Sequence, residues 1–222
     1  MTEADMAFID TIPAAEADGP VAEMYRRQQS NWGFVPNYAK VFSHRPEIMA
    51  RWAALLAEIK RPMDKRRFEL VTFVAAHELR HSACALAHGK ALREFFTDAE
   101  IVAIAGGRCA GILDAADSAL VAFARLVARD AAAVTEEQVS TLKAHGFTDA
   151  EVFDIAAAAA GRAFFTKVLD ATGVLMDSPA LAFDPAFRDP LTVGRPIDTR
   201  ECETIEPGGR AAAEWNRGPV SA

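Results

Sequence analysis

The chain has 222 residues, of which 51% are apolar and 25% are charged, and its net charge is −7. This is the composition of a globular protein that can bury a full core, and the negative charge excludes a phosphate-binding surface, so no nucleic-acid partner is expected. No uncharged apolar stretch reaches the roughly 18 residues needed to span a membrane. The start of the chain has no signal-peptide character and the three widely spaced cysteines do not suggest a disulfide scaffold, so we expect a cytoplasmic protein.

Prolines and glycines divide the first part of the chain into three expected helices. The first covers 20–30 and begins with a proline, which lacks only an N–H group that would be unpaired in a first turn. A break at 32–36 contains a glycine and a proline and precedes a short helix at 37–42. A third helix is expected over 46–59, where apolar residues recur at steps of three and four.

A longer helical stretch follows. Asp64 is a suitable N-cap for its start, and helical character continues to about residue 94. Ser82 offers a second N-cap within this stretch, so we expect a kink or a helix boundary near His81. The basic run at 65–67 is flanked by acidic residues, and we interpret it as a solvated helix face.

Three capping boxes predict helix starts at about 98, 136 and 149. In each box, a threonine hydroxyl and an acidic or amide side chain satisfy each other's free backbone N–H groups. Another helix is expected over 114–129, and the last one should end near residue 171 because Gly173 follows it. Few segments are rich in β-branched and aromatic residues, so the predicted fold class is all-α.

Two short segments of the sequence are repeated further along the chain. Residues 96–101 return as 147–152, and residues 69–73 resemble 119–123, at offsets of 51 and 50 residues. Duplication of a helical unit explains this pattern. The alternative is coincidence, because capping boxes are common.

We interpret residues 1–174 as one all-helical domain with two similar units, at about 64–106 and 114–171. Only the first unit is expected to carry reactive side chains, because nothing in the second replaces Cys84. Residues 175–222 contain six prolines and little helical periodicity. We expect this tail to be extended and to wrap a neighbouring subunit, with disorder of its end as the alternative.

The segment 77–89 holds three of the five histidines and one of the three cysteines. Cys84 and His88 are four residues apart and share a helix face, and Glu69 lies among apolar residues of the preceding, largely buried helix. A thiol attacks only as thiolate, and a free cysteine with a pKa of ~8.5 is mostly protonated at neutral pH. A neighbouring histidine can take this proton, and a helix N-terminus favours the anion. The pattern therefore predicts a thiolate that attacks a peroxide and yields a sulfenic acid.

A less reactive interpretation stands beside this one. A cysteine in an alanine-rich helix is usually a small core residue. We interpret His77 as a surface or structural residue, and Cys109 and Cys202 as chemically inert.

Several stretches resemble the carboxymuconolactone decarboxylase / alkylhydroperoxidase D-like superfamily. The family pattern is a glutamate, then a Cys-x-x-Cys pair, then a histidine four residues after the second cysteine. Glu69, Cys84 and His88, with flanking residues at 66–71 and 97–101, carry this resemblance. Residues typical of the peroxidase-related branch lie at 32–37, 44–47 and 191–196.

The resemblance covers roughly residues 8–196 and implies an all-helical fold and a symmetric homo-oligomer. It also implies that Glu69 and His88 form a proton relay that activates Cys84 as the peroxidatic thiol of an alkylhydroperoxidase-like oxidoreductase. The expected partners are a small-molecule hydroperoxide and a thiol reductant, and no cofactor is expected.

His81 stands where the family has the first cysteine of its pair. Cys84 therefore cannot form the usual local disulfide, and after oxidation it needs an external thiol or a distant cysteine such as Cys109. We include His81 among the candidate catalytic residues, as a second base or as a hydrogen-bond donor.

Three other functions are consistent with the same residues. On one continuous helix, His77, His81, Cys84 and His88 would form a stripe, and two or three of them could bind zinc or another borderline metal together with Glu69. A decarboxylase-type enzyme would use His88 and Glu69 for acid–base chemistry on a small carboxylate-bearing lactone. A non-catalytic protein that keeps only the fold is the third possibility.

Overall fold

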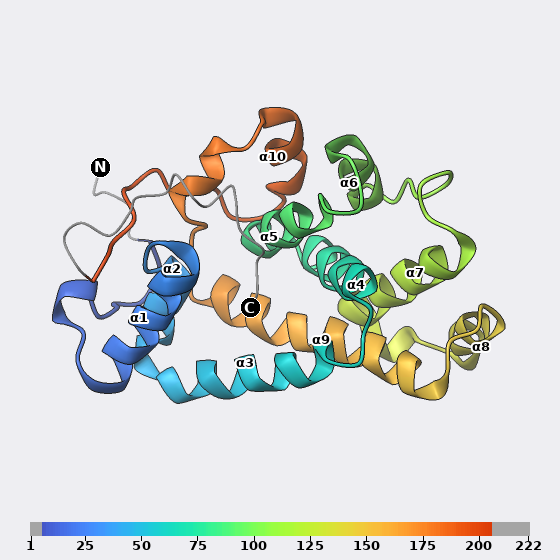
Figure 1. Ribbon diagram of the computed structural model, residues 1–222, viewed down its shortest axis with the longest axis horizontal. Coiled ribbons are helices and arrows are strands. Elements are labelled where there is room, and N and C mark those ends of the chain that lie inside the picture. Colours follow the sequence, from blue (N-terminus) through green and yellow to red (C-terminus); the bar gives the residue numbers. More distant parts are fainter. Residues whose placement is uncertain (1–5, 206–222) are drawn as a thin grey trace.

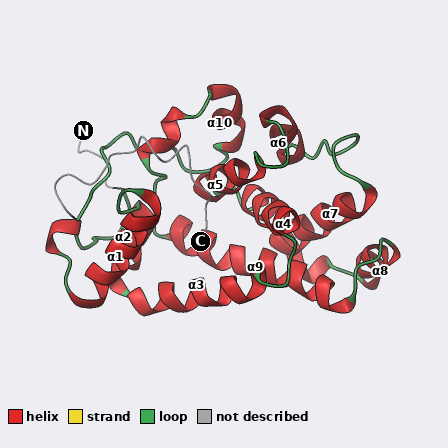
Figure 2. Ribbon diagram, in the orientation of Figure 1, coloured by secondary structure: helices red, strands yellow, loops and turns green. Residues whose placement is uncertain are grey.

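Every regular element in the described part of the chain is helical. The computed structural model of the 222-residue chain describes residues 6–205. Within that range it has ten α-helices, four short 3₁₀ helices and no β-strand, only an isolated bridge between Met176 and Ile197. The predicted all-α fold class is confirmed (Figure 2). No helix of residues 6–205 has the length and the hydropathy that crossing a bilayer requires.

The α-helices, labelled in Figure 1, are α1 (Gly19–Trp32), α2 (Asn37–Val41), α3 (Pro46–Lys60), α4 (Lys65–Glu78), α5 (Ser82–Leu92), α6 (Asp98–Ala105), α7 (Ala115–Asp130), α8 (Glu136–Ala144), α9 (Asp149–Ala171) and α10 (Pro185–Leu191). The 3₁₀ helices are η1 (Ala14–Glu16), η2 (Phe42–His44), η3 (Ala131–Ala133) and η4 (Ser178–Ala182). These bounds confirm the three expected helices before residue 62 and the helix over 114–129, to within about two residues at each end.

The three capping boxes begin helices where the sequence predicts them. Thr97, Thr135 and Thr148 are the N-caps of α6, α8 and α9, and each threonine forms the reciprocal bonds of the box with the side chain three residues later. The last of these helices ends at Ala171, and Gly173 follows with a φ of 78°, as a left-handed helix terminus requires.

Helix α4 is the centre of the molecule. All nine residues from 68 to 76 are buried, and the helix packs against α5, α7 and α9. In Figure 1, α9 and α3 run side by side below α4, while α10 and α6 lie above α5. A helix that is apolar nearly all round belongs in the interior, so α4 holds Glu69 in the core, one helix away from Cys84 on α5.

The two proposed units follow the same order of helices. Helices α4, α5 and α6 precede α7, α8 and α9, and the starts of α4 and α7 and of α6 and α9 are 50 and 51 residues apart. This agrees with a duplication, which stays a prediction.

The basic run at the start of α4 joins the two units. Arg66 and Arg67 both form ion pairs with the fully buried carboxylate of Asp117 on α7, and Arg67 Nε lies 3.0 Å from Asp117 Oδ1. The interpretation of these residues as a solvated face was therefore wrong for both arginines, because the packing of α4 on α7 brings a carboxylate to them.

The tail differs in part from the expected extended segment. Within residues 175–205 it forms η4 and α10, and α10 packs on α5 and α6 of its own chain. Asp184 caps α10 by accepting the N–H of Ala186, and Phe187 and Leu191 are buried, which explains why this proline-rich stretch folds. Residues 1–5 and 206–222 lie outside the described chain, so wrapping of a neighbouring subunit and disorder of the end stay predictions.

Candidate active site

Cys84 lies in the first turn of α5. The chain reverses between α4 and α5 through Arg80, which has a left-handed φ of 57°. His81 is the N-cap residue, and its Nδ1 accepts the backbone N–H of Cys84 at 3.1 Å. The expected boundary near His81 is confirmed, but Ser82 is the first helical residue and not the cap. Because the free N–H groups of a first turn favour negative charge, this position suits a thiolate.

The tail holds the start of α5 in place. Ser82 Oγ donates to the carbonyl of Arg195 at 2.8 Å and accepts the N–H of Gly194 at 3.0 Å. A Cβ atom on Gly194 would lie 1.8 Å from the carbonyl oxygen of Arg80, so only glycine fits. The sequence singled out the 191–196 segment, and the structure shows that it packs against the turn that carries Cys84.

Glu69 and His88 form a buried pair. His88 Nδ1 lies 2.6 Å from Glu69 Oε2 and 3.2 Å from Thr72 Oγ1. Burial and then Arg162 lower the pKa of His88, although Glu69 opposes them. Burial raises the pKa of Glu69, but His88 and Lys60 outweigh it and the pKa falls below its ordinary value. A carboxylate that accepts the proton on Nδ1 leaves Nε2 of a neutral imidazole free as a base.

Lys60 extends this pair toward the surface. Its Nζ lies 3.6 Å from Glu69 Oε1, and its side chain is 28% exposed whereas that of Glu69 is 2% exposed. Lys60 is the last residue of α3, so its meeting with Glu69 depends on the packing of α3, and the sequence analysis did not predict it.

Arg162 of α9 completes the surroundings of Cys84. Its Nη1 lies 3.6 Å from Cys84 Sγ, and the residue is buried. The second unit therefore contributes a charged side chain to the surroundings of Cys84, although the expected reactive residues all belong to the first unit. The available signal was a single arginine within the apolar and small residues of 155–165, which is an unusual position for a charge.

The charges around Cys84 favour its ionised form. Burial raises the pKa of the Cys84 thiol, but His81 and Arg162 outweigh this effect and hold the pKa below its ordinary value. Burial lowers the pKa of His81, and the neighbouring Cys84 raises it above its ordinary value. A negative charge on the thiol and a positive charge on His81 favour each other, but in the cap geometry Nδ1 accepts the Cys84 N–H and is therefore unprotonated.

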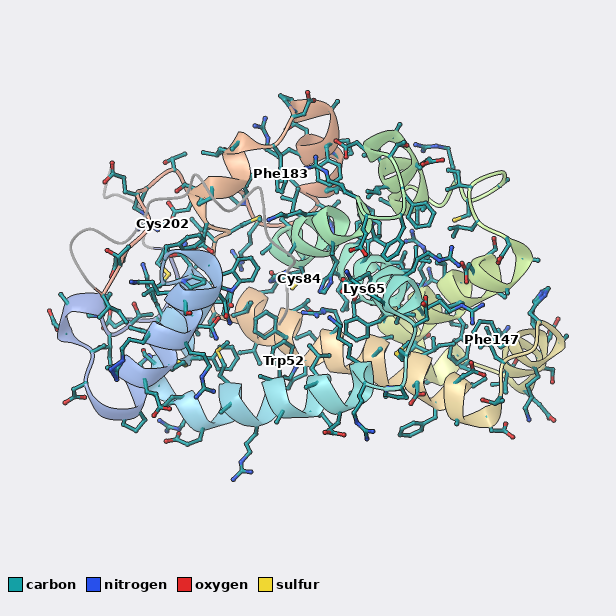
Figure 3. The ribbon with its side chains drawn as sticks, viewed as in Figure 1. Trp52, Lys65, Cys84, Phe147, Phe183 and Cys202 are labelled. Carbon is teal, nitrogen blue, oxygen red and sulfur yellow. The ribbon has the colours of Figure 1, made fainter. Side chains whose placement is uncertain are left out.

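The reactive groups border one cavity of about 200 Å³. Cys84, His81, His88 and Arg162 line it, as do the exposed residues Arg27 and Asn31 of α1. Figure 3 shows Cys84 and Trp52 near the centre of the molecule. Large apolar and aromatic side chains form most of the wall, among them Trp32, Phe34, Tyr38, Met49, Trp52 and Phe165.

His77 does not join this group. It precedes the break between α4 and α5, packs near the Phe73 ring and does not line the cavity. Burial and Arg125 lower its pKa. The single stripe required by the metal alternative is interrupted at the break, and within residues 6–205 no three His, Cys, Asp or Glu side chains are arranged to hold a metal ion.

The other two cysteines are free and do not line the cavity. Burial raises the pKa of Cys109, and it raises the pKa of Cys202 to about 11. Both thiols are therefore poor nucleophiles at neutral pH.

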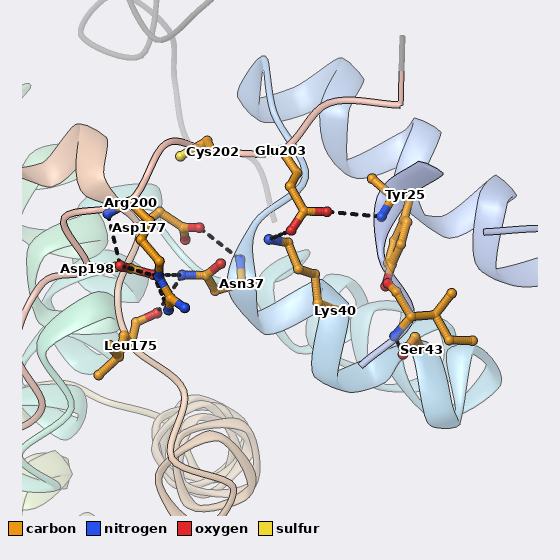
Figure 4. A network of polar contacts seen from close by, with 12 residues as sticks. Tyr25, Asn37, Lys40, Ser43, Leu175, Asp177, Asp198, Arg200, Cys202 and Glu203 are labelled. Carbon is orange, nitrogen blue, oxygen red and sulfur yellow. Dashed lines mark hydrogen bonds and ion pairs between the residues drawn. The ribbon is translucent and has the colours of Figure 1, made fainter. Parts of the chain in front are cut away.

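A polar network beside the cavity ties α2 to the tail (Figure 4). Asn37 donates its backbone N–H to Asp177 Oδ1 at 2.8 Å and its side-chain amide to Asp198 Oδ2 at 3.2 Å. Lys40 binds Glu203 at 2.7 Å. Asp177 also lines the cavity, and burial raises its pKa to about 7.

Solved structures share this architecture. The chain is 21% identical to an alkylhydroperoxidase AhpD core, an uncharacterized peroxidase-related protein from Ralstonia eutropha JMP134, with a TM-score of 0.68 over 83% of this chain and 96% of that one. An uncharacterized peroxidase-related protein from Silicibacter sp. TM1040 is 22% identical, with a TM-score of 0.67 over 80% and 95%. No protein-family model and no curated protein matches the chain.

A further solved structure with this fold is that of a protein named for a different activity. It is a cysteine-to-alanine variant of the debrominase Bmp8 in complex with 2,3,4-tribromopyrrole, which is 17% identical, with a TM-score of 0.60 over 77% of this chain and 89% of that one. These identities establish similarity of fold alone. The protein thus has the all-helical AhpD-like fold, as the sequence resemblance predicts.

Proposed function

We propose that this protein is a thiol-dependent oxidoreductase that reduces organic hydroperoxides through Cys84. The observation that carries the proposal is the position of Cys84 in a helix first turn, 3.6 Å from a buried arginine and in the lining of an apolar cavity that His88 also lines. The lowered pKa of the Cys84 thiol supplies the nucleophile, and the apolar wall suits the organic part of the substrate.

The first half-reaction follows from these groups. His88, held by Glu69 through Nδ1, takes the thiol proton on Nε2. The Cys84 sulfur then attacks the terminal oxygen of the hydroperoxide, so that an S–O bond forms and the O–O bond breaks. The thiolate is oxidised to a sulfenic acid, and the peroxide is reduced to an alkoxide. The alkoxide takes the proton from His88 and leaves as the alcohol.

The second half-reaction uses an external thiol, because His81 occupies the position of the family's first cysteine. A thiolate from the reductant attacks the sulfenic sulfur, which forms a mixed disulfide and releases water after proton uptake. A second reductant thiolate attacks that disulfide, restores Cys84 as thiolate and leaves as the oxidised disulfide. The expected catalytic residues are therefore Cys84, His88, Glu69 and His81.

A trapping experiment tests this proposal. The purified protein is treated with cumene hydroperoxide, sulfenic acid is captured with a dimedone-type probe, and the labelled peptide is identified by mass spectrometry. Label is expected on Cys84 and not on Cys109 or Cys202, and Cys84→Ser should abolish it. Label on another cysteine, with none on Cys84, contradicts a peroxidase that works through this site.

Reductive debromination of a small aromatic ring is the second candidate. The aromatic wall of the cavity favours it, and one neighbour in fold is a debrominase crystallised with 2,3,4-tribromopyrrole. Incubation of the protein with tribromopyrrole and dithiothreitol, followed by measurement of bromide, tests this reaction. Bromide release that requires Cys84, without sulfenic-acid labelling by hydroperoxide, would favour debromination over peroxide reduction.

A further inference from the structure

We propose that Arg162 is a catalytic residue of this site, which holds Cys84 as a thiolate and then binds the negatively charged oxygen released by the attack. The first role concerns the protein without substrate. The second role rests on the proposed peroxide chemistry.

The contacts of Arg162 single it out. A guanidinium keeps its charge at every physiological pH. Arg162 is 3% exposed, and its Nη1 lies 3.6 Å from Cys84 Sγ. Its Nε and Nη2 are buried without a hydrogen-bond partner. Burial of a charge with unpaired donors is costly unless something compensates it, so this arginine is costly to the fold and points to a role in the site.

The neighbouring carboxylate does not pair directly with Arg162, although its charge and that of Arg162 favour each other. Both oxygens of Glu69 are engaged, Oε2 with His88 and Oε1 with Lys60. Among the described ion pairs, none joins Arg162 to a carboxylate. The direct contact of the guanidinium with an ionisable group is with the sulfur of Cys84.

Aromatic side chains hold the guanidinium in place. It lies 5.6 Å from the centre of the Trp52 ring and 5.9 Å from that of Phe165. Trp52 Nε1 also donates to the carbonyl of Gly161 at 3.2 Å, which fixes the backbone next to Arg162. These contacts orient the arginine without neutralising it, so its charge remains available to the thiol.

This arrangement suits the proposed reaction step. When the thiolate attacks, negative charge moves from sulfur to the oxygen that leaves. A cation that is already oriented beside the sulfur stabilises that charge without reorganisation, and it does so strongly in a buried apolar site. Once His88 returns its proton to the oxygen, the neutral alcohol has no charge to hold it at Arg162.

The first test measures the thiol pKa. All variants are made in a Cys109→Ser, Cys202→Ser background, so that only Cys84 reacts with iodoacetamide, and the alkylation rate is followed against pH. His81 and Arg162 act directly on the pKa of Cys84, and Tyr38 is coupled to it. The other titratable groups of the neighbouring elements are Asp170, which acts on His81, and the cluster of His88, Glu69 and Lys60, on which Arg162 also acts.

Arg162→Met should raise the midpoint by at least about one pH unit, which leaves roughly tenfold less thiolate at neutral pH. Arg162→Lys keeps a positive charge and should raise the midpoint less than Arg162→Met does. Arg51→Met, a change of an exposed arginine on α3, is the matched control and should leave it unchanged. An unaltered midpoint in folded Arg162→Met overturns the first role.

A second measurement leaves Arg162 intact, in case its variants do not fold. In a His81→Asn background, which keeps a good N-cap residue, Cys84→Asp is compared with Cys84→Asn. If Arg162 attracts a negative charge at position 84, the aspartate variant has the higher thermal midpoint at neutral pH, by more than Ala83→Asp exceeds Ala83→Asn in the same first turn, and the difference disappears at low pH. An aspartate variant less stable than the asparagine variant contradicts the proposal.

The second role is tested by the rate constants of the fully ionised thiol. Arg162→Met should lower the rate with cumene hydroperoxide at least about tenfold more than the rate with iodoacetamide, because no alkoxide leaves in alkylation. Equal decreases for both reagents overturn this role. If the wild-type thiol does not react with the hydroperoxide, the proposed function fails, but the pKa comparison still decides the first role.

Discussion

Cys84 and Arg162 are 78 residues apart in the chain, yet Sγ of one lies 3.6 Å from Nη1 of the other. The contact joins the first turn of α5 to the middle of α9, and therefore joins the two helical units. The reactive cysteine belongs to one unit, and a cation that lowers its pKa belongs to the other. A site of this kind requires both units to pack correctly, even though only one of them contains the family's motif.

Loss of the Glu69 charge should impair catalysis. In Glu69→Gln the amide no longer favours the proton on His88 Nδ1 as a carboxylate does, so His88 becomes a weaker base. We expect the rate of hydroperoxide reduction to fall by roughly 10²-fold. Steady-state assays at neutral pH measure this. Glu78→Gln is the matched control on the same helix, since Glu78 pairs with Arg125 and Arg129 away from the cavity.

A comparison of Cys84→Ser with Glu69→Gln distinguishes the acid–base alternative from the thiol mechanism. A decarboxylase-type enzyme would keep its activity on a lactone in Cys84→Ser and lose it in Glu69→Gln. A thiol peroxidase would lose activity toward hydroperoxide in both. Activity that depends on Glu69 but not on Cys84 would therefore argue against the thiol mechanism.

Gly194→Ala should destabilise the protein. The new methyl group would lie 1.8 Å from the Arg80 carbonyl oxygen, so the tail or the turn before α5 has to move. We expect a loss of about 1–3 kcal/mol, the range for overpacked sites, measured by urea unfolding. Gly161→Ala is the control, because its Cβ meets only Ile59 and Leu56 at 3.6 and 3.9 Å. A similar unfolding midpoint for wild type and Gly194→Ala would show that the tail does not constrain this turn.

Asp177 should make stability depend on pH. Burial raises its pKa to about 7 in the folded state, against about 3.9 when unfolded. Protonation therefore favours the folded state. The stabilisation that the folded state gains from a protonated Asp177 is fully present below about pH 4 and is lost as the pH rises to about 7. Asp177→Asn should have the same stability as the wild type near pH 4 and should be more stable than the wild type above about pH 7. Thermal midpoints measured between these pH values test this.

Asp198 provides a control with the opposite sign. Burial raises its pKa, but Arg200 outweighs burial and holds the pKa below its ordinary value. Asp198→Asn should therefore be less stable than wild type at neutral pH, with the difference shrinking in acid. If both variants respond to pH alike, the titration does not arise from the burial of Asp177.

Replacing His81 by cysteine should restore the family's pair. The protein loses the imidazole cap of α5, at a cost of about 1 kcal/mol, and gains a thiol three residues before Cys84. After treatment with hydroperoxide we expect an 81–84 disulfide by mass spectrometry, and faster turnover with a dithiol reductant. Persistence of a dimedone-reactive sulfenic acid without a disulfide would show that the start of α5 cannot bring the two sulfurs together.

The sequence by itself determined the helices and the position of the reactive segment. The capping boxes at Thr97, Thr135 and Thr148 satisfy backbone groups within three residues, so they specify helix starts without help from the rest of the fold. The four-residue spacing of Cys84 and His88 likewise places both on one turn of one helix.

Only the tertiary structure decided what surrounds Cys84. Arg162, Lys60 and Gly194 reach the site from α9, from α3 and from the tail, across distances in the chain that no local pattern encodes. The sequence shows on which helix or segment each of these residues lies. The packing of apolar faces decides which charged side chains meet in the core. For that reason the location of the thiol was predictable, whereas the contacts that bring Arg162 and Gly194 to it were not.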